Sequence, residues 1–396
     1  MMRCLWLTLA DPDPPLDGLF VYSGGLIRAF ASAGAEVVAL GLRRPESVKQ
    51  DNEREQGVIW RLAAHEPLSH WASLTSSLPH MANRCRSAGM TDLLRSLLQE
   101  GVWDAIVFDS LSAGWALRTV LDHYPCAPRR PAFVYVSHNH EESLRASLVP
   151  SQHGLLKRQA QRLDAAKVAR LERELVRFAD LVTAITPEDG DIYRSQWPTK
   201  RIGVLTPGYS GHSVSARRIT TDLPRRAVIV GSFDWTAKRL NLEEFVRVAD
   251  PIFAARHIEL RVIGSGDRAY FDDLSKTLSA TQFTGTVARV EPYVEDARLA
   301  IVPERNGGGF KLKVLDYIFN RIPILALRGS VAGVPLRHEE SILLFPDQEK
   351  LALGISHVID DVAQLDQIQN AAFEACQHAF EWRSRGAQLL SAMACL

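Results

Sequence analysis

Short β-rich runs alternate with longer helical patterns along this chain, and no other feature limits its fold more. Such alternation is typical of βαβ units, in which a helix connects two parallel strands. In the first half we expect helices at 24–35 and 90–101. The strands expected there span residues 3–9, 36–42, 58–64, 104–108, 132–137 and 181–186.

A second alternating series begins near residue 226. The expected strands span 226–233, 258–266, 297–304 and 323–327, and the expected helices span 241–255, 310–319 and roughly 366 to the end. Between the two series the periodicity disappears, and serines, threonines and paired arginines replace it. We therefore expect an α/β protein with two doubly wound domains, residues 1–206 and 226–375, joined by a linker at 207–225. Ligands of such folds bind at the carboxyl ends of the strands, which here would face a common cleft.

Length and composition narrow the class of protein. The chain has 396 residues, more than one ordinary core accommodates. Its 46 basic and 46 acidic residues argue against a nucleic-acid-binding protein. Five scattered cysteines without a CxxC pair suit a reducing compartment. The first apolar run is too short for a signal peptide or a membrane span, so we expect a cytoplasmic protein.

The stretch GGGFKLKVLDYIFN, residues 307–320, is the most informative motif. Three glycines follow a strand and lead into a helix predicted to start near Phe310, where free backbone N–H groups can bind an anion. Lys313 and Asp316 share one helical face. A lysine for phosphate and a carboxylate for ribose hydroxyls suit a nucleoside diphosphate. The alternative is a surface helix with an ordinary ion pair after a loop.

A second cationic pair, Lys238 and Arg239, follows Gly231 at the end of another strand. At the same edge of the sheet these side chains would complete a diphosphate site. A solvated Lys-Arg pair on the surface is the alternative.

Gly24 and Gly25 follow the first strand and precede a helical pattern. We interpret them as a turn at a helix N-terminus, again suited to an anion. A tight turn without a ligand is the other interpretation.

The segment VSHNHEE, residues 136–142, places two histidines after a strand. His138 and His140 are two residues apart and would point the same way in extended backbone. A metal site is one interpretation, although no second ligand cluster has matching spacing. A histidine that bonds a sugar or a phosphate, or transfers a proton, is another. A structural histidine is the third.

Two further motifs bear on other chemistries. Gly264, Gly266 and Ala269 match a dinucleotide-binding fingerprint in form, which keeps an oxidoreductase open. The segment 208–212 lacks the final glycine of a nucleophile elbow, so a serine hydrolase is not indicated.

Residues 145–177 contain eight basic and three acidic residues interleaved with leucines. A basic amphipathic helix of this kind can lie on an anionic membrane. A solvated helix face is the alternative.

Together these motifs resemble those of bacterial GT-B glycosyltransferases, close to glycosyltransferase family 4, along nearly the whole chain. Residues 22–37 resemble the family's loop near the donor diphosphate, and 136–142 resemble its active-site histidine segment. Residues 230–241 stand where the family has its phosphate-binding Arg/Lys. Residues 303–325 resemble the donor-site loop and helix, 179–189 the lead-in to the linker, and 380–390 the final helix.

The resemblance implies the GT-B fold, with an acceptor-side domain at 1–206, a donor-binding domain at 226–375 and a C-terminal helix, 376–396, that packs back on the first domain. It implies a UDP- or GDP-sugar donor, a saccharide or lipid-linked acceptor, retaining transfer in polysaccharide or glycoconjugate synthesis, and no cofactor or metal. His138 would be catalytic and Asp316 would bind the ribose. The residues expected at the diphosphate are Gly24, Gly25, Lys238, Arg239, Gly308, Gly309, Phe310 and Lys313. Those expected at the sugar are Arg305, Asn306, His140 and Glu142.

One departure from the family affects the mechanism. The family's stronger signature has two glutamates eight residues apart, where this chain has Gly308 and Asp316. Asp316 can still bond a ribose, but Gly308 cannot supply a carboxylate near the sugar. A nucleotide-sugar epimerase of the same fold and a non-catalytic sugar- or nucleotide-binding relative therefore remain alternatives.

Overall fold

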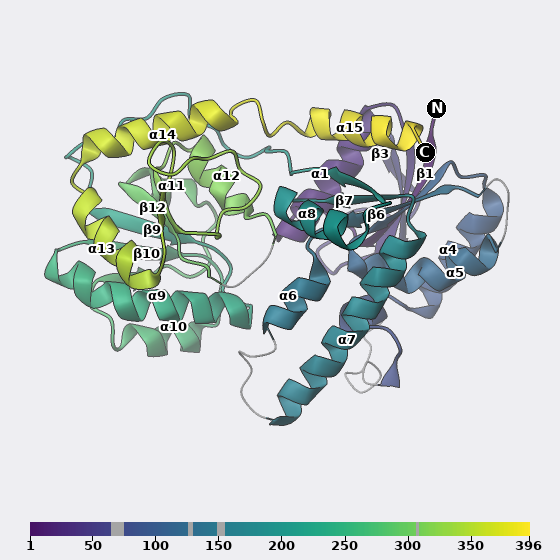
Figure 1. Ribbon diagram of the computed structural model, residues 1–396, viewed down its shortest axis with the longest axis horizontal. Coiled ribbons are helices and arrows are strands. Elements are labelled where there is room, and N and C mark those ends of the chain that lie inside the picture. The colour runs from purple at the N-terminus through teal and green to yellow at the C-terminus, as the bar shows by residue number, and fades with distance from the viewer. Residues whose placement is uncertain (65–74, 126–129, 149–154, 306–308) are drawn as a thin grey trace. The chain divides into compact units, whose positions relative to one another are not determined.

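The computed structural model describes residues 1–64, 75–125, 130–148, 155–305 and 309–396, and Figure 1 shows it as a ribbon. The chain forms two compact units. The first unit comprises Met1–Gly208 and Glu381–Leu396, and the second comprises Tyr209–Phe380. Residues 209–225 are irregular, but they pack on the second unit, where Ile219 is buried. The segment expected as a linker, 207–225, thus belongs to the second unit from Tyr209 onward.

The first unit is built on an eight-stranded sheet with the order β3-β4-β2-β1-β5-β6-β7-β8. All neighbouring strands are parallel except β3, which pairs antiparallel with β4 at the edge. Helices cover the sheet, so its central strands are long apolar runs. The strands are β1 Arg3–Ala10, β2 Glu36–Leu42, β3 Glu53–Glu55, β4 Val58–Ala63, β5 Ala105–Asp109, β6 Ala132–Ser137, β7 Leu181–Ala184 and β8 Arg201–Val204.

The first helix starts earlier than the sequence suggested. It spans Gly18–Ser32, so Gly24 and Gly25 lie inside it, and the predicted glycine turn is wrong. The other helices of this unit are α3 His80–Asn83, α4 Ala88–Glu100, the 3-10 helix η1 Leu111–Ala116, α5 Leu117–His123, α6 Glu141–Leu148, α7 Leu155–Phe178, α8 Pro187–Gln196 and α15 Trp382–Ala394.

The last helix, α15, packs against α1 within the first unit. A Cβ on Gly25 would lie 2.3 Å from the Trp382 ring, and one on Gly386 would lie 2.0 Å from the backbone oxygen of Ala29. The two helices therefore approach closely at glycines. Only their bare backbone allows this contact.

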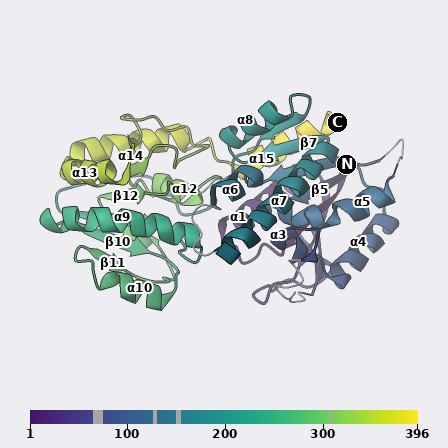
Figure 2. The same cartoon turned by 60° about the horizontal axis from the view of Figure 1, so that its bottom comes forward.

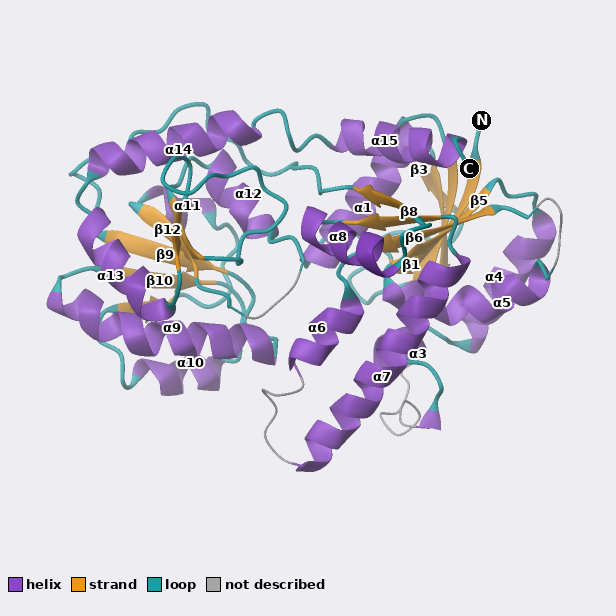
Figure 3. Ribbon diagram, in the orientation of Figure 1, coloured by secondary structure: helices purple, strands orange, loops and turns teal. Residues whose placement is uncertain are grey.

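The second unit has a six-stranded, fully parallel sheet with the order β11-β10-β9-β12-β13-β14. Figure 3 shows its strands in orange between purple helices. The strands are β9 Arg226–Val230, β10 Glu259–Ile263, β11 Thr281–Phe283, β12 Leu299–Val302, β13 Ile324–Leu327 and β14 Leu343–Phe345. The helices are α9 Thr236–Ala255, α10 Arg268–Ser275, α11 Glu291–Glu295, α12 Leu312–Phe319, α13 Gln348–Val358 and α14 Val362–Cys376.

Alternate residues of these strands face two separate apolar clusters. Ala227 and Ile229 pack on one face with α9, α10 and α13, while Val228 packs on the other with α11 and α12. Figure 1 shows α9 and α10 together on one side of this sheet and α12 on the other side, and Figure 2 shows the same ribbon turned by 60°. The sheet is thus covered on both faces, which confirms the doubly wound α/β class.

The strand orders define where each unit can bind a ligand. In the second unit the chain leaves β9 toward β10 and leaves β12 toward β13, so the order reverses between β9 and β12. In the first unit it reverses between β1 and β5. Loops diverge at such a point and leave a crevice at the carboxyl edge of the sheet.

Within the described residues, no helix is both long enough and apolar enough to cross a bilayer.

The close contact of α15 with α1 predicts a specific sensitivity. We expect Gly386→Ala to destabilise the first unit by about 1–3 kcal/mol, because the new methyl group overlaps the α1 backbone. Gly89→Ala in α4 is the matched control. It meets only Ser87 Oγ at 4.0 Å and should stabilise by about 0.4–1 kcal/mol. Denaturant unfolding followed by tryptophan fluorescence measures both, and equal effects would contradict the packing argument.

Candidate functional site

Two loops meet at the switch point of the second unit, one after β9 and one after β12. The backbone N–H of Val230, at the end of β9, donates to the Tyr317 hydroxyl of α12 at 2.7 Å. The Arg305 N–H, after β12, donates to Asn241 Oδ1 of α9 at 3.2 Å. These bonds hold the starts of α9 and α12 at the same edge of the sheet.

The starts of α9 and α12 differ from those of three other helices in this unit. Aspartates cap α10, α13 and α14, with the carboxylates of Asp267, Asp347 and Asp361 accepting backbone N–H groups. The N-cap residues of α9 and α12, Trp235 and Lys311, provide no side-chain hydrogen bond, and neither does that of the short α11. The two switch-point helices thus keep N-termini that favour an anion.

Lys313 and Lys311 bring positive charge to the start of α12. Lys313 Nζ forms an ion pair with Glu304, which follows β12, and both side chains are only 15% exposed. Burial lowers the pKa of Lys311, Glu304 raises it and Lys313 lowers it. Lys311 and Glu304 were not among the predicted site residues, although both lie within the resembling segment.

The two residues of the second cationic pair, Lys238 and Arg239, have different contacts. Lys238, in the first turn of α9, donates to Ser232 Oγ at 3.0 Å and remains exposed. Arg239 donates to the Asp234 carbonyl at 3.0 Å, and its guanidinium lies 5.6 Å from the centre of the Tyr270 ring. The contacts of Arg239 thus tie the β9–α9 loop to α10, and Lys238 is the better placed to receive an anion.

Asp316 lies one turn after Lys313 on α12. Its side chain reaches solvent, while protein atoms around the carboxyl displace part of its hydration. This desolvation raises the pKa of Asp316 to about 6; a hydrogen bond from Tyr209 lowers it, and the charge of Glu291 raises it. The Tyr209 ring stacks on Phe319 at 4.3 Å, which fixes it beside α12.

The other residues predicted around this loop differ in their exposure and in what they contact. Gly309 has a left-handed backbone with φ of 76°. The Phe310 ring packs against Phe380 at 5.7 Å, so a ligand would meet its backbone rather than its ring. Arg305 is exposed and 3.9 Å from Glu244 of α9. Gly308 and Asn306 lie outside the described residues.

The dinucleotide fingerprint has a structural explanation. Gly264 has a φ of 134°, and a Cβ there would lie 1.7 Å from the Gly231 carbonyl oxygen. The helix that follows, α10, has eight residues, and Asp267 caps it with a carboxylate. A pyrophosphate at this helix start would meet that negative charge, which argues against the oxidoreductase alternative.

His138 lies at the carboxyl edge of the first unit, directly after β6. Its Nε2 is 2.7 Å from Asp109 Oδ1, and Asp109 Oδ2 accepts the Trp6 indole N–H at 3.0 Å. The Tyr22 ring meets the imidazole edge-on at 5.0 Å. Because a carboxylate only accepts hydrogen bonds, Nε2 carries the proton and Nδ1 of neutral His138 is an acceptor. Asp109 ends β5, one residue beyond the predicted strand, and its pairing with His138 over 29 residues has no local signal.

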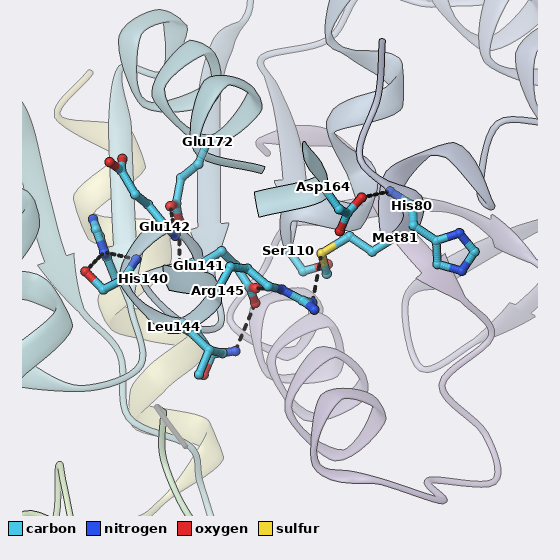
Figure 4. Close-up of polar contacts among 12 residues, drawn as sticks. His80, Met81, Ser110, His140, Glu141, Glu142, Leu144, Arg145, Asp164 and Glu172 are labelled. Carbon is cyan, nitrogen blue, oxygen red and sulfur yellow. Dashed lines mark hydrogen bonds and ion pairs between the residues drawn. The ribbon is translucent and has the colours of Figure 1, made fainter. Parts of the chain in front are cut away.

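His140 and Glu142 have partners within the first unit. The two nitrogens of His140 contact Ser143 Oγ at 2.7 Å and Gln196 Oε1 at 3.2 Å. Glu142 forms an ion pair with Arg173 of α7. Figure 4 shows both residues within one polar cluster at the start of α6. Their geometry favours a structural role over sugar contact.

The helix that begins after β1 is closed to anions. Its N-cap, Asp17, accepts the N–H groups of Leu19 and Phe20 with its carboxylate. Gly24 and Gly25 lie two turns further on, facing Pro12 and Trp382 respectively. Their assignment to a diphosphate turn is therefore wrong. Among the described residues no cluster of histidine, cysteine, aspartate and glutamate could hold a metal ion.

Comparison with known proteins adds independent findings. A family model described as glycosyl transferase 4-like domain matches residues 17–208, and one described as glycosyl transferases group 1 matches residues 224–361. No curated protein sequence matches the chain.

Three solved structures illustrate the shared fold. Sucrose-phosphate synthase from Thermosynechococcus elongatus has a TM-score of 0.72 at 16% identity, covering 100% of this chain and 99% of its own. HepE of Anabaena, in complex with UDP and glucose, has a TM-score of 0.64 at 13% identity and full coverage of both chains. WaaG, a glycosyltransferase involved in lipopolysaccharide biosynthesis, has a TM-score of 0.63 at 15% identity, covering 98% and 99%.

The surroundings of Asp316 predict its titration. We expect its carboxyl to titrate near pH 6, above the ordinary 3.8, because the folded protein desolvates it. Tyr209→Phe should raise this pKa further, since the lost hydrogen bond favours the ionised form. Glu291→Gln should lower it, since a negative neighbour is removed. Carbon-13 NMR of labelled aspartate measures all three, and a wild-type titration at the ordinary value would contradict the prediction.

Proposed function

The chain belongs to the nucleotide-sugar glycosyltransferases of GT-B fold and family 4 (group 1) type, and on this premise we propose how its second unit holds the donor. The donor diphosphate binds at the switch point between β9 and β12. The N-termini of α9 and α12 supply backbone N–H groups, and Lys238, Lys311 and Lys313 neutralise the charge. The single observation that carries this proposal is the pair of helix starts without carboxylate caps beside lysines.

The ion pair of Lys313 with Glu304 fits this role. A half-buried lysine held by one carboxylate is already directed toward the loop where the diphosphate would bind. Cations fixed in this way stabilise the charge that develops as the diphosphate leaves. Lysines can thus supply the positive charge that a metal ion would otherwise supply to the leaving diphosphate. We therefore propose that the sugar is transferred without a metal ion.

Asp316 is proposed to bind the ribose of the donor. Its carboxyl reaches solvent on the same helix as Lys313, one turn further from the phosphate site. An ionised carboxylate can accept hydrogen bonds from both ribose hydroxyls. We favour a UDP-linked donor over a GDP-linked one because HepE, which shares the fold, was solved with UDP and with UDP-glucose.

The first unit is proposed to supply the acceptor side and His138 as the catalytic residue. Nδ1 of neutral His138 accepts hydrogen bonds, so it suits a sugar hydroxyl better than a phosphate oxygen. The acceptor is proposed to be a saccharide or a lipid-linked saccharide in polysaccharide or glycoconjugate synthesis, with retention of configuration. The family resemblance supports these last features.

Peripheral contact with an anionic membrane is proposed for α7. Leu163 and Phe178 are exposed on this helix by 48% and 38%, beside exposed Arg162, Arg170 and Arg177. A recess of about 540 Å³ lies on the same helix, and Trp197 is among the residues that line it. Arginines with exposed apolar side chains are typical of helices that lie in the membrane interface.

The donor site can be tested by calorimetric titration with UDP, GDP, dTDP and NAD. We expect micromolar binding of one nucleoside diphosphate, weakened at least about tenfold by Lys313→Ala, because the lost cation faces the diphosphate. Turnover of the matching nucleotide sugar should fall by about 10²-fold. Lys276→Ala, on the exposed face of α10, is the control and should change neither. Binding of NAD alone, or a Lys313→Ala variant within twofold of wild type, would contradict the proposal.

Membrane contact can be tested separately by vesicle flotation. Vesicles containing phosphatidylglycerol should bind the protein, and phosphatidylcholine vesicles should not. The double variant Arg170→Ala/Arg177→Ala should bind several-fold less, and added salt should have a similar effect because it screens surface charge. Arg247→Ala/Arg268→Ala in the second unit is the charge-matched control. Equal flotation with both lipids, or with neither, would contradict the proposed contact.

A further inference from the structure

Glu172, in the C-terminal half of α7, is a carboxylate buried to 2% exposure. Figure 4 shows it beside the first residues of α6. Its Oε1 accepts the Glu141 N–H at 3.0 Å and the Tyr193 hydroxyl at 2.6 Å, with the Tyr135 hydroxyl at 3.5 Å. Its Oε2 accepts the Glu142 N–H at 2.7 Å. These four donors are all uncharged.

A carboxylate in this position needs a physical reason, because burial disfavours its ionised form. Desolvation raises the pKa of Glu172, and its hydrogen bonds from Tyr193 and the α6 backbone act against this. The N-terminus of α6 supplies the compensation, since its N–H groups and helix dipole attract negative charge. Glu172 therefore acts as an N-terminal cap for α6, although it is 31 residues away in the sequence.

The residues that Glu172 holds are continuous with His138. The short segment from Ser137 to Glu142 connects β6 to α6. At its start, Ser137 Oγ donates to the Asn139 carbonyl at 2.6 Å and lies 2.8 Å from the Tyr193 hydroxyl. Tyr193 donates to Glu172, which holds the end of the segment, and its hydroxyl also contacts Ser137 at the start. His138 lies between these two contacted points.

We propose that Glu172 is a positioning residue for His138. From α7 it fixes the backbone of Glu141 and Glu142, which follows the histidine, and so the direction of Nδ1, without touching substrate. The inference rests on the catalytic role proposed for His138. It assigns to α7 a contribution to the site that is separate from its exposed face.

The arrangement requires a carboxylate rather than an amide. Each oxygen of Glu172 accepts a backbone N–H, so both must be acceptors. A glutamine of the same shape presents an NH₂ group to one of those N–H groups, and the start of α6 must shift. Glu172→Gln is therefore the most informative variant. Glu174→Gln makes the same chemical change two residues away, at an exposed position of α7.

The test uses the full-length protein labelled with ¹⁵N in its histidine rings, with His138→Asn to identify the His138 resonances. In wild type we expect neutral His138 to be protonated at Nε2. In Glu172→Gln its resonances should shift toward a mixture of tautomers, and kcat with the donor found by calorimetry should fall by about tenfold or more, with little change in KM. Glu174→Gln should leave both unchanged. Unaltered His138 resonances in a folded Glu172→Gln would overturn the proposal.

Two further variants distinguish failure of the positioning role of Glu172 from failure of the catalytic role of His138. If Glu172→Gln does not fold, Tyr193→Phe removes one bond of the same network and should shift the His138 resonances in the same direction; no shift would overturn the proposal. His138→Asn tests the proposed function separately. If this variant keeps wild-type turnover, the catalytic role of His138 is wrong, while the resonances still decide whether Glu172 positions it.

Discussion

Backbone N–H groups at the start of a helix need an acceptor, and in parallel α/β units these starts gather at the carboxyl edge of the sheet. This requirement organises both units. In the first, Asp17 and Glu172 satisfy helix starts after β1 and β6 with the protein's own carboxylates. In the second, α9 and α12 begin without such a cap, and lysines surround them. Carboxylates therefore occupy these two helix starts of the first unit, whereas the starts of α9 and α12 in the second unit can bind an anion.

The local sequence was sufficient to predict an element where burial and hydrophobic periodicity determine its secondary structure. Strands at 36–42 and 132–137 were predicted to the residue, because each consists of apolar residues apart from one polar residue at its end. It also predicted a helix after the glycines, with Lys313 and Asp316 on it, although α12 starts two residues later than expected. The short strands β3, β8, β11 and β14 were missed, since three or four residues carry little periodic signal.

Distant contacts explain what the sequence could not reveal. Gly24 and Gly25 look like a turn, yet Gly25 is required by Trp382, which lies more than 350 residues later. Asp17 is a local signal for the true helix start, because aspartate is a preferred N-cap residue, and the sequence analysis did not consider it. The partners of His138 and of the α6 start, Asp109 and Glu172, come from β5 and α7. No spacing rule links them, so only the fold reveals that both histidine and helix are held by carboxylates.

The charges of the β12–α12 loop also bear on the missing carboxylate at Gly308. Glu304 is the acid that the structure places there, and it is paired with Lys313. Lys311 and Lys313 against Glu304 leave one net positive charge beside a helix N-terminus, which favours an anion more than a loop with a second free acid would. When a diphosphate binds, Lys313 can exchange one anionic partner for another without being left unpaired in a half-buried position. The absence of a carboxylate at Gly308 is therefore consistent with tight donor binding. We expect it to affect how the sugar is bound rather than how the diphosphate is bound.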